Sequence, residues 1–215
     1  HQWGGTCELY PLDLWIHPKE NPPLDFIPDA SVLVVRKGVD ATLKSQGMDN
    51  ITPKMRLDEL LAFNWDTQYY DTRRKRVLNK HARHNVCFDD EAKSADFTNK
   101  QGTIIAWKDV PITNTIRTGL QLFLGPKAAN LKGEGNKYNN VNINGISGHG
   151  DSERKKVAMW RCGASAYICF RAHQNHKPIG RPLAIYLNDG DLLFMSEKAG
   201  GFDWKLHKNN LITLI

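Results

Sequence analysis

The segment with the clearest chemical potential is residues 143–153, which reads INGISGHGDSE. His149 and Asp151 stand two positions apart, and on an extended backbone side chains at that spacing point the same way. An imidazole and a carboxylate, completed by a distant histidine, form the two-His-one-carboxylate triad, which suits iron(II) that must keep open positions. The spacing therefore predicts two ligands of an iron centre, whereas the alternative interpretation of an isolated His-x-Asp is a solvated surface pair.

Further motifs accompany this segment in a fixed order along the chain. They are Asn136-Lys137-Tyr138, His149-Gly150-Asp151-Ser152-Glu153, CGASAYICFR at 162–171, LNDGDLLFMS at 187–196 and WKLH at 204–207. Their order and spacing resemble those of the AlkB-like family of 2-oxoglutarate oxygenases. The similarity covers residues 80–215 and is strongest over residues 136–196.

The resemblance implies a fold, a cofactor set and several site residues. The implied fold is α+β, with a double-stranded β-helix (jelly-roll) core and N-terminal helices packed on one face. The implied cofactors are Fe(II) and 2-oxoglutarate, with dioxygen as cosubstrate. His149, Asp151 and His207 would bind the iron, and Asn136 and Tyr138 would contact 2-oxoglutarate.

Two departures from the family pattern bear on this assignment. The family's Trp-x-His is Trp-x-x-His here, ending at His207. The family also places an arginine after this histidine, where a planar guanidinium pairs with the distal carboxylate of 2-oxoglutarate. Residues 211–215 (LITLI) carry no such arginine, so either the natural chain continues or another cation serves. Arg161 and Arg171, on predicted strands, are the candidate substitutes.

Four more side chains are candidates for contacts with a substrate. Glu153 and Arg154 follow Asp151 directly and are expected at the mouth of the site, where they contact substrate or orient the carboxylate. Trp160 and Tyr167 are candidates for stacking on a base, with core packing as the alternative for aromatic residues in strands.

Positive charge is concentrated in one short segment of a chain whose formal net charge is +6. Its members are Arg73, Arg74, Lys75, Arg76, Lys80 and Arg83. The segment is either a solvated basic face or a set of phosphate contacts to DNA or RNA. With the family resemblance, it favours oxidation of a methylated or otherwise modified base, by alkylation repair or 5-methylpyrimidine hydroxylation. The alternatives are a protein hydroxylase and a non-catalytic nucleic-acid-binding module on the same fold.

The elements that must position these residues differ between the two parts of the chain. Residues 1–66 are expected to form an extension with a strand at 31–36 and helices at 40–45 and 56–65, and residues 67–215 to form the oxygenase core. The core is predicted to hold a strand at 102–107, a helix at 113–124 and a polar loop at 127–140. Four strands follow, at 141–146, 157–171, 182–196 and 211–215.

Several features of the sequence bear on the cellular compartment in which the protein is expected. No apolar run approaches the roughly 20 residues that a bilayer crossing needs. The start of the chain lacks the pattern of a secretory signal. The four cysteines are scattered and form no CxxC pair, which favours reduced thiols in the cytoplasm or nucleus over secretion. Cys162 and Cys169 lie in an apolar stretch and are predicted to be core residues, while the oligomeric state stays open.

Overall fold

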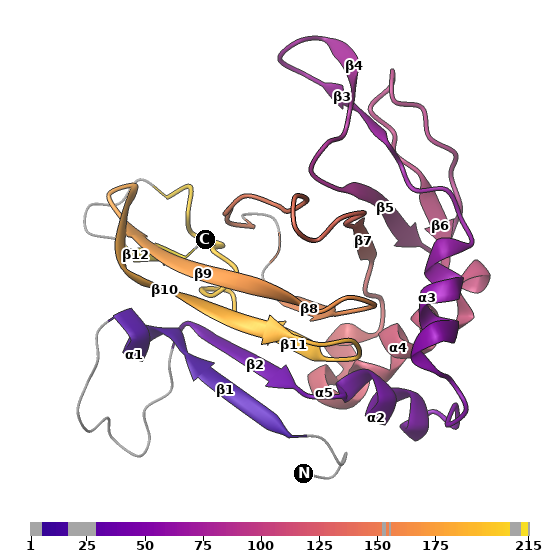
Figure 1. The fold of residues 1–215 in the computed structure, drawn as a ribbon, viewed down its shortest axis with the longest axis horizontal. Helices are drawn as coiled ribbons and strands as arrows, with labels where there is room; N and C mark the ends of the chain where they lie inside the picture. Colours follow the sequence, from indigo (N-terminus) through magenta and orange to yellow (C-terminus); the bar gives the residue numbers. More distant parts are fainter. Residues whose placement is uncertain (1–5, 17–28, 152–153, 155, 207–211, 215) are drawn as a thin grey trace. The chain divides into compact units, whose positions relative to one another are not determined.

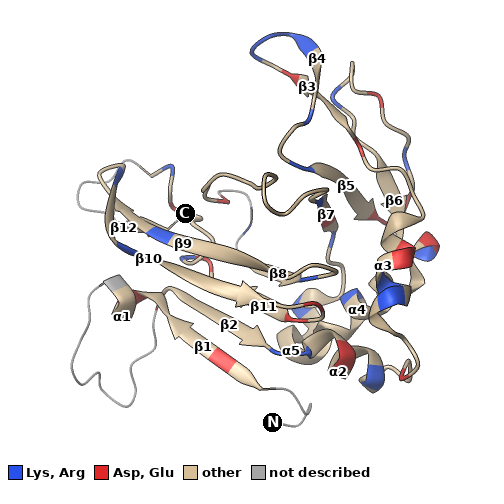
Figure 2. Cartoon of the chain, viewed as in Figure 1, with Lys and Arg blue, Asp and Glu red and all other residues tan. Residues whose placement is uncertain are grey.

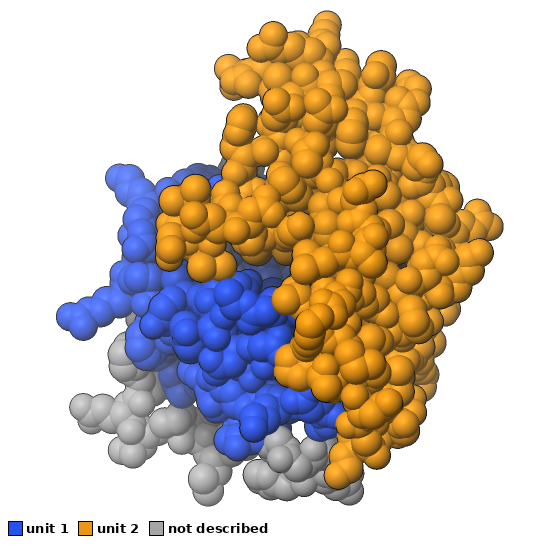
Figure 3. Space-filling model, turned by 45° about the vertical axis from the view of Figure 1, so that its right-hand side comes forward, with its two compact units in different colours: residues 1–41, 147–215 blue, residues 42–146 orange. Residues whose placement is uncertain are grey.

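The computed structural model describes residues 6–16, 29–151, 154, 156–206 and 212–214. The chain divides into two compact units, His1–Ala41 with Ser147–Ile215 and Thr42–Ile146, which Figure 3 distinguishes by colour. The fold is mixed α and β and rich in strands, and most of its strand pairs are antiparallel. The predicted boundary between residues 66 and 67 lies inside the second of these units.

The first unit contains two antiparallel sheets (Figure 1). One has the order β1-β2-β11-β8, formed by Cys7–Pro11, Ser31–Val35, Leu192–Met195 and Val157–Trp160. The other has the order β10-β9-β12, formed by Lys177–Leu187, Ala166–Gln174 and Ile212–Leu214. The short helix α1 (Leu12–Ile16) follows β1 and contacts β10.

Apolar side chains from both sheets form a single core. Side chains alternate between the two faces of a strand, so every second residue of these strands faces inward. The buried members include Val32, Val34, Phe170, Ala172, Leu183, Ile185, Leu187, Leu193 and Leu214. Truncation of one of the buried leucines, or of Ile185, to alanine is expected to cost about 2–5 kcal/mol.

The β9–β10 hairpin turns through Asn175 and His176, whose φ angles of 51° and 62° match the twist of a two-residue hairpin. On β9 the alternation leaves Tyr167, Cys169 and Arg171 exposed on the face opposite the core. The prediction that Cys169 is a core residue was therefore wrong, because the strand's period of two assigns it to the outer face. Cys162 is only partly buried.

The second unit is built around a three-stranded sheet. Strand β5 (His84–Asp89) lies between β6 (Ile104–Ala106), which is parallel to it, and β7 (Gly133–Lys137), which is antiparallel. A separate hairpin consists of β3 (Gln68–Asp71) and β4 (Arg76–Asn79). The core of this unit is aromatic, and it contains Val86, Phe88, Trp107 and Val110 with Leu60, Phe63, Trp65 and Ile105 packed on it.

Helices flank this sheet, and polar side chains fix where they begin. Helix α3 (Pro53–Leu61) begins after Thr52, whose hydroxyl accepts from the backbone N–H of Met55. The Glu59 carboxylate accepts from the first N–H groups of α4 (Pro111–Gly119). The remaining helical segments are α2 (Gly38–Ser45), α5 (Gln121–Leu124) and the 3-10 turns η1 (Trp107–Asp109) and η2 (Gly125–Ala128). None of these described helices has both the length and the apolar composition needed to cross a membrane.

Two neighbouring predictions were wrong in opposite directions. The predicted loop at 127–140 contains strand β7, because Gly133 and Gly135 leave room for aromatic rings: a Cβ there would lie 2.8 Å from Trp107 and from Trp65. The predicted strand at 141–146 is a turn and an irregular segment. Its apolar residues face solvent, and asparagine side chains such as Asn140 bond to the nearby backbone instead.

The two long predicted strands are each interrupted. Residues 157–171 form β8 and the start of β9, and residues 182–196 form the end of β10 and β11. Gly163 and Gly190 adopt φ angles of 78° and 81° at the breaks, which other residues rarely adopt. The backbone N–H of Gly163 donates to Asp189 at 2.7 Å, so the two turns brace each other.

Candidate metal centre and basic segment

His149 and Asp151 lie in the first unit, on an irregular segment that precedes β8. The Nε2 atom of His149 is 3.8 Å from Oδ1 of Asp151. Both side chains keep access to solvent, with exposed fractions of 50% and 28%. Since metal–ligand bonds of this kind are about 2.0–2.2 Å long, two atoms at this separation are within reach of one shared ion.

A close approach between two segments fixes the backbone of this pair. The N–H of Asp151 donates to the carbonyl of Gly200 at 2.8 Å. Gly150 leaves no room for a side chain, since a Cβ would lie 2.6 Å from both Gly201 O and the indole of Trp204. The middle residue of His-Gly-Asp must therefore be glycine for the 147–151 segment to pack against residues 200–204.

A backbone contact sets the orientation of the His149 ring. Its Nδ1 lies 2.9 Å from the carbonyl oxygen of Ser147, a distance at which Nδ1–H donates. The tautomer that makes this bond carries its lone pair on Nε2, on the side of Asp151. Metal-binding histidines are commonly oriented by such a bond from the other ring nitrogen. On the far side of the carboxylate, Nη1 of Arg154 is 3.5 Å from Oδ2 of Asp151.

Buried polar atoms lie next to this pair. The indole Nε1 of Trp204 is buried and has no hydrogen-bond partner within the described part of the chain. The same holds for Oδ1 of Asp203, whose other carboxylate oxygen pairs with Lys198. Buried donors and acceptors of this kind are normally satisfied. The Trp204 indole lies against Gly150, so its N–H is a candidate donor to a molecule bound at this site.

The third predicted iron ligand cannot be placed, because His207 lies outside the described residues, as does Glu153. In the ranges that are described, no group of three or more His, Cys, Asp and Glu side chains is arranged to hold a metal ion. The described part of the centre is thus one imidazole, one carboxylate and the guanidinium of Arg154.

The residues expected to contact 2-oxoglutarate are divided between the units. Asn136 is on β7 in the second unit, and its Oδ1 accepts from Nε of Arg83 at 2.5 Å. Tyr138 follows the same strand and is half-buried. In the first unit, Nε of Arg161 donates to the carbonyl of Ala164, while Arg171 is exposed on the outer face of β9.

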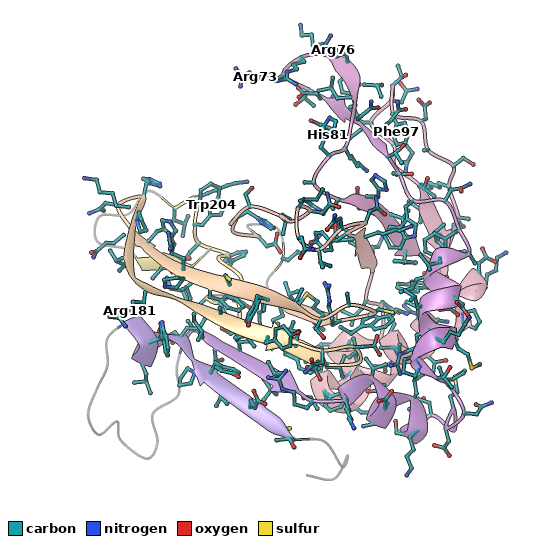
Figure 4. The ribbon with its side chains drawn as sticks, viewed as in Figure 1. Arg73, Arg76, His81, Phe97, Arg181 and Trp204 are labelled. Atoms are coloured by element: carbon teal, nitrogen blue, oxygen red, sulfur yellow. The ribbon has the colours of Figure 1, made fainter. Side chains whose placement is uncertain are left out.

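The basic segment forms the hairpin of β3 and β4 and the approach to β5. Arg73 and Arg76 extend outward at its turn (Figure 4), and the four residues 73–76 are all exposed. Lys80 is partly buried and donates to Oδ1 of Asn85. Burial, which disfavours the charged form, lowers the pKa of this lysine below its ordinary value. Among the predicted phosphate contacts, those at the turn are therefore the most accessible.

Sequence reasoning missed Gly200 and Gly201 as parts of the site. A Gly-Gly pair followed closely by Asp-Trp is a signal for a tight turn against which another segment can pack. Gly201 has a φ of 70°, and a Cβ there would lie 2.2 Å from the carbonyl of Leu214. The signal was present in the sequence, but the identity of the packing segment depends on the fold.

Comparison with known proteins gives one clear relationship. No family model matches the chain. The chain is 34% identical over 211 residues to an uncharacterized protein of Acanthamoeba polyphaga mimivirus, and the match covers 98% of this chain and 77% of that protein. The chain belongs to the same family as this mimivirus protein. The match spans residues of both units, so the relationship concerns nearly the whole chain and not one motif.

Proposed function

We propose that the chain is an Fe(II)- and 2-oxoglutarate-dependent dioxygenase of the AlkB-like type, acting on a methylated or otherwise modified base in DNA or RNA. The observation that carries the proposal is the convergence of His149 Nε2 and Asp151 Oδ1 at 3.8 Å, with Nδ1 of His149 engaged by a backbone carbonyl. Iron(II) with 2-oxoglutarate would supply oxidation of a C–H bond by dioxygen, with succinate and carbon dioxide as co-products.

Each residue of the candidate centre has a role in this proposal. His149, Asp151 and His207 hold the metal, and Arg154 orients the Asp151 carboxylate from 3.5 Å. Glu153 stands at the mouth of the site. The partial exposure of His149 and Asp151 leaves a side from which small molecules and a base can approach.

Binding of 2-oxoglutarate is assigned to three further residues. Asn136 and Tyr138 would form hydrogen bonds to it, and Arg161 would pair with its distal carboxylate, since the other candidate, Arg171, is exposed on the outer face of β9. Two antiparallel sheets that share one apolar core support a double-stranded β-helix as the scaffold. An intracellular enzyme, cytoplasmic or nuclear, fits this chemistry.

The nucleic-acid substrate rests on the basic turn between β3 and β4. Four consecutive exposed cations, Arg73 to Arg76, lie at the end of a two-stranded hairpin (Figure 2). Cations at such a turn can contact phosphates while a base is extruded from its stack. Phosphate contacts of this kind make binding salt-dependent but independent of sequence.

Succinate release from 2-oxoglutarate by the full chain, supplied with Fe(II) and a methylated oligonucleotide, tests the proposal. Wild-type protein is expected to release succinate, and His149→Ala and Asp151→Ala are expected to release none while keeping the wild-type circular dichroism spectrum. His176→Asn, which changes an exposed histidine on the β9–β10 turn, is the matched control and should behave as wild type.

Succinate release, read together with DNA binding at several salt concentrations, separates the alternatives. Turnover in His149→Ala or Asp151→Ala would overturn the assignment of the site. Absence of succinate with salt-sensitive DNA binding would favour a non-catalytic nucleic-acid-binding module. Succinate release stimulated by a protein substrate, with no salt-sensitive affinity for DNA, would favour a protein hydroxylase.

A further inference from the structure

Two tyrosines form a pair on the outer face of the β9–β10 hairpin, opposite the apolar core of the first unit. Tyr167 and Tyr186 are direct partners across the two strands. Their ring centroids are 4.8 Å apart, with an angle of 55° between the ring planes. Exposed fractions of 68% and 45% are high for aromatic rings in the middle of a sheet. This pair therefore contributes little to the core and needs another explanation.

The stretch of sequence that contains this pair is basic. From Arg154 to Asn188, both included, it contains seven Lys and Arg residues and no Asp or Glu. Of these cations, Arg171, Lys177 and Arg181 are exposed on the hairpin itself. Figure 2 shows basic colour, and no acidic colour, along β9 and at the turn end of the hairpin.

The strand register relates these side chains to one another. Tyr167, Cys169 and Arg171 are alternate residues of β9 and so share one face. Arg171 lies four positions after Tyr167, about 13 Å along the strand. Between them, Cys169 lies opposite Ala184 of β10, which is also exposed. Both are small residues, so no large side chain of these two strand positions stands between the ring pair and Arg171.

We propose that the outer face of β9 and β10 is a stacking platform for single-stranded nucleic acid. Exposed rings on a sheet accept bases by stacking, and neighbouring cations contact the phosphates. Of the possible occupants, a polyanion with flat apolar groups fits both features, because it supplies a partner for the tyrosines and for Arg171, which shares their face of the hairpin. This inference does not depend on iron binding, and its residues belong to the first unit, whereas the basic turn at residues 73–76 belongs to the second.

Equilibrium binding of a fluorescein-labelled oligothymidylate to the full chain tests the platform. The double variant Tyr167→Ala with Tyr186→Ala is expected to bind at least about tenfold more weakly, because two rings no longer stack on bases. The double variant with phenylalanine at both positions keeps the rings and should bind within about twofold of wild type. Leu9→Ala, which removes an exposed side chain from β1 in the same unit, is the control. Wild-type affinity in the double alanine variant would overturn the proposal.

Alkylation of the cysteines locates the bound strand. Cys169 lies on the platform, and Cys7 is an exposed cysteine on β1 that serves as an internal reference. Saturating oligothymidylate should slow the reaction of Cys169 with a maleimide several-fold and leave Cys7 unchanged, as followed by peptide mass spectrometry. Equal rates at Cys169 with and without the oligonucleotide would contradict the proposal, even if binding occurs elsewhere on the chain.

Two further measurements separate this occupant from others. A duplex of the same length should compete weakly, because its bases are already stacked inside the helix. Arg171→Gln should reduce the slope of log affinity against log salt by about 0.7, as expected for one phosphate contact to a single strand. Sedimentation that shows a wild-type dimer and a monomeric double alanine variant would assign the face to self-association and overturn the proposal.

Discussion

Two clusters in the first unit each place a cationic or imidazole group beside a carboxylate, and they differ in how fully those groups are satisfied. Arg36 contacts Glu8 at 2.7 Å through Nε and Asp191 at 2.6 Å through Nη1, and it also donates to the carbonyl of Tyr186. Asp191 is almost completely buried. These bonds join β1, β2 and the turn before β11, so the charges are used to hold strands together.

The pair of His149 and Asp151 is arranged differently. Its atoms are 3.8 Å apart, which is too long for a hydrogen bond, and both side chains are accessible to solvent. The backbone around it is closely packed through Gly150, whereas the functional atoms remain open. The comparison indicates that Asp191, whose carboxylate is buried and bonded, stabilises the fold. Asp151, whose carboxylate is held in place but accessible to solvent, can bind a ligand.

Removal of Arg36 should have the largest effect on the free energy of unfolding. In Arg36→Ala the buried Asp191 carboxylate loses its cation, and we expect the free energy of unfolding to fall by about 3–5 kcal/mol. Asp151→Ala should change it by no more than about 0.5 kcal/mol, because its surroundings are partly solvated. Urea unfolding followed by circular dichroism measures both, and similar losses in the two variants would break the comparison.

The basic turn, Arg73 to Arg76, contains a third kind of charged group, which is exposed to solvent and available to bind phosphates. Replacement of Arg73, Arg74, Lys75 and Arg76 by glutamine should weaken DNA binding by about tenfold or more at low salt. It should also reduce the salt slope by about 0.9 for each phosphate that the variant no longer neutralises. Lys54→Gln is the control, since this exposed lysine on α3 pairs with Asp58. Anisotropy titrations at several salt concentrations provide the measurement, and an unchanged slope would show that the turn is only solvated.

Acid should weaken the ion pair between Arg36 and Glu8. The Arg36 guanidinium and the Tyr10 hydroxyl, both hydrogen-bonded to Glu8, lower the pKa of that carboxyl from 4.5 to about 2. Because the folded-state pKa is lowered, this stabilisation is present above about pH 4.5 and is lost as pH falls towards 2. The unfolding free energies of wild type and Glu8→Gln should differ by about 1 kcal/mol or less at neutral pH, since solvent screens this part-exposed pair. The difference should shrink in acid; a constant difference would contradict the assignment.

The smallest expected effect on the free energy of unfolding concerns Trp204, whose indole N–H is buried. Trp204→Phe removes an N–H that has no partner in the described part of the chain, so the unfolding free energy of the metal-free protein should change little beyond the loss of ring volume. If the site binds a molecule that accepts from this N–H, Trp204→Phe should reduce the increase in Tm produced by Fe(II) with 2-oxoglutarate. An identical increase in both proteins would remove Trp204 from the site.

Much of the strand content could be predicted, because runs rich in β-branched, aromatic and aliphatic residues between turn residues are typical of buried strands. Residues 31–36 and 157–171 are such runs, and β2, β8 and the first part of β9 lie there. Strand β7 could not be found in this way, since its Gly-Glu-Gly sequence is explained only by the rings of Trp65 and Trp107, which are distant in sequence.

The candidate site was predictable to a similar degree. The spacing of His149 and Asp151 indicates side chains that point the same way, and in the structure Nε2 of His149 is 3.8 Å from Oδ1 of Asp151. Their packing against residues 200–204 could not be derived from spacing, because it depends on two glycines that meet across the fold. The exposed pair of Tyr167 and Tyr186 likewise depends on strand register, which a single sequence does not specify.

Iron(II) binding under anaerobic conditions tests the central claim most directly. In the presence of 2-oxoglutarate, the wild-type full chain should bind one equivalent of iron(II) and develop the visible charge-transfer absorption of an iron–2-oxoglutarate chelate. Arg36→Gln, which alters the cluster of Arg36, Glu8 and Asp191, should retain this signal under conditions where the variant is folded. His149→Ala and Asp151→Ala should lose the signal. A signal of wild-type strength in His149→Ala and Asp151→Ala, or no iron binding by the wild-type chain, would contradict the account.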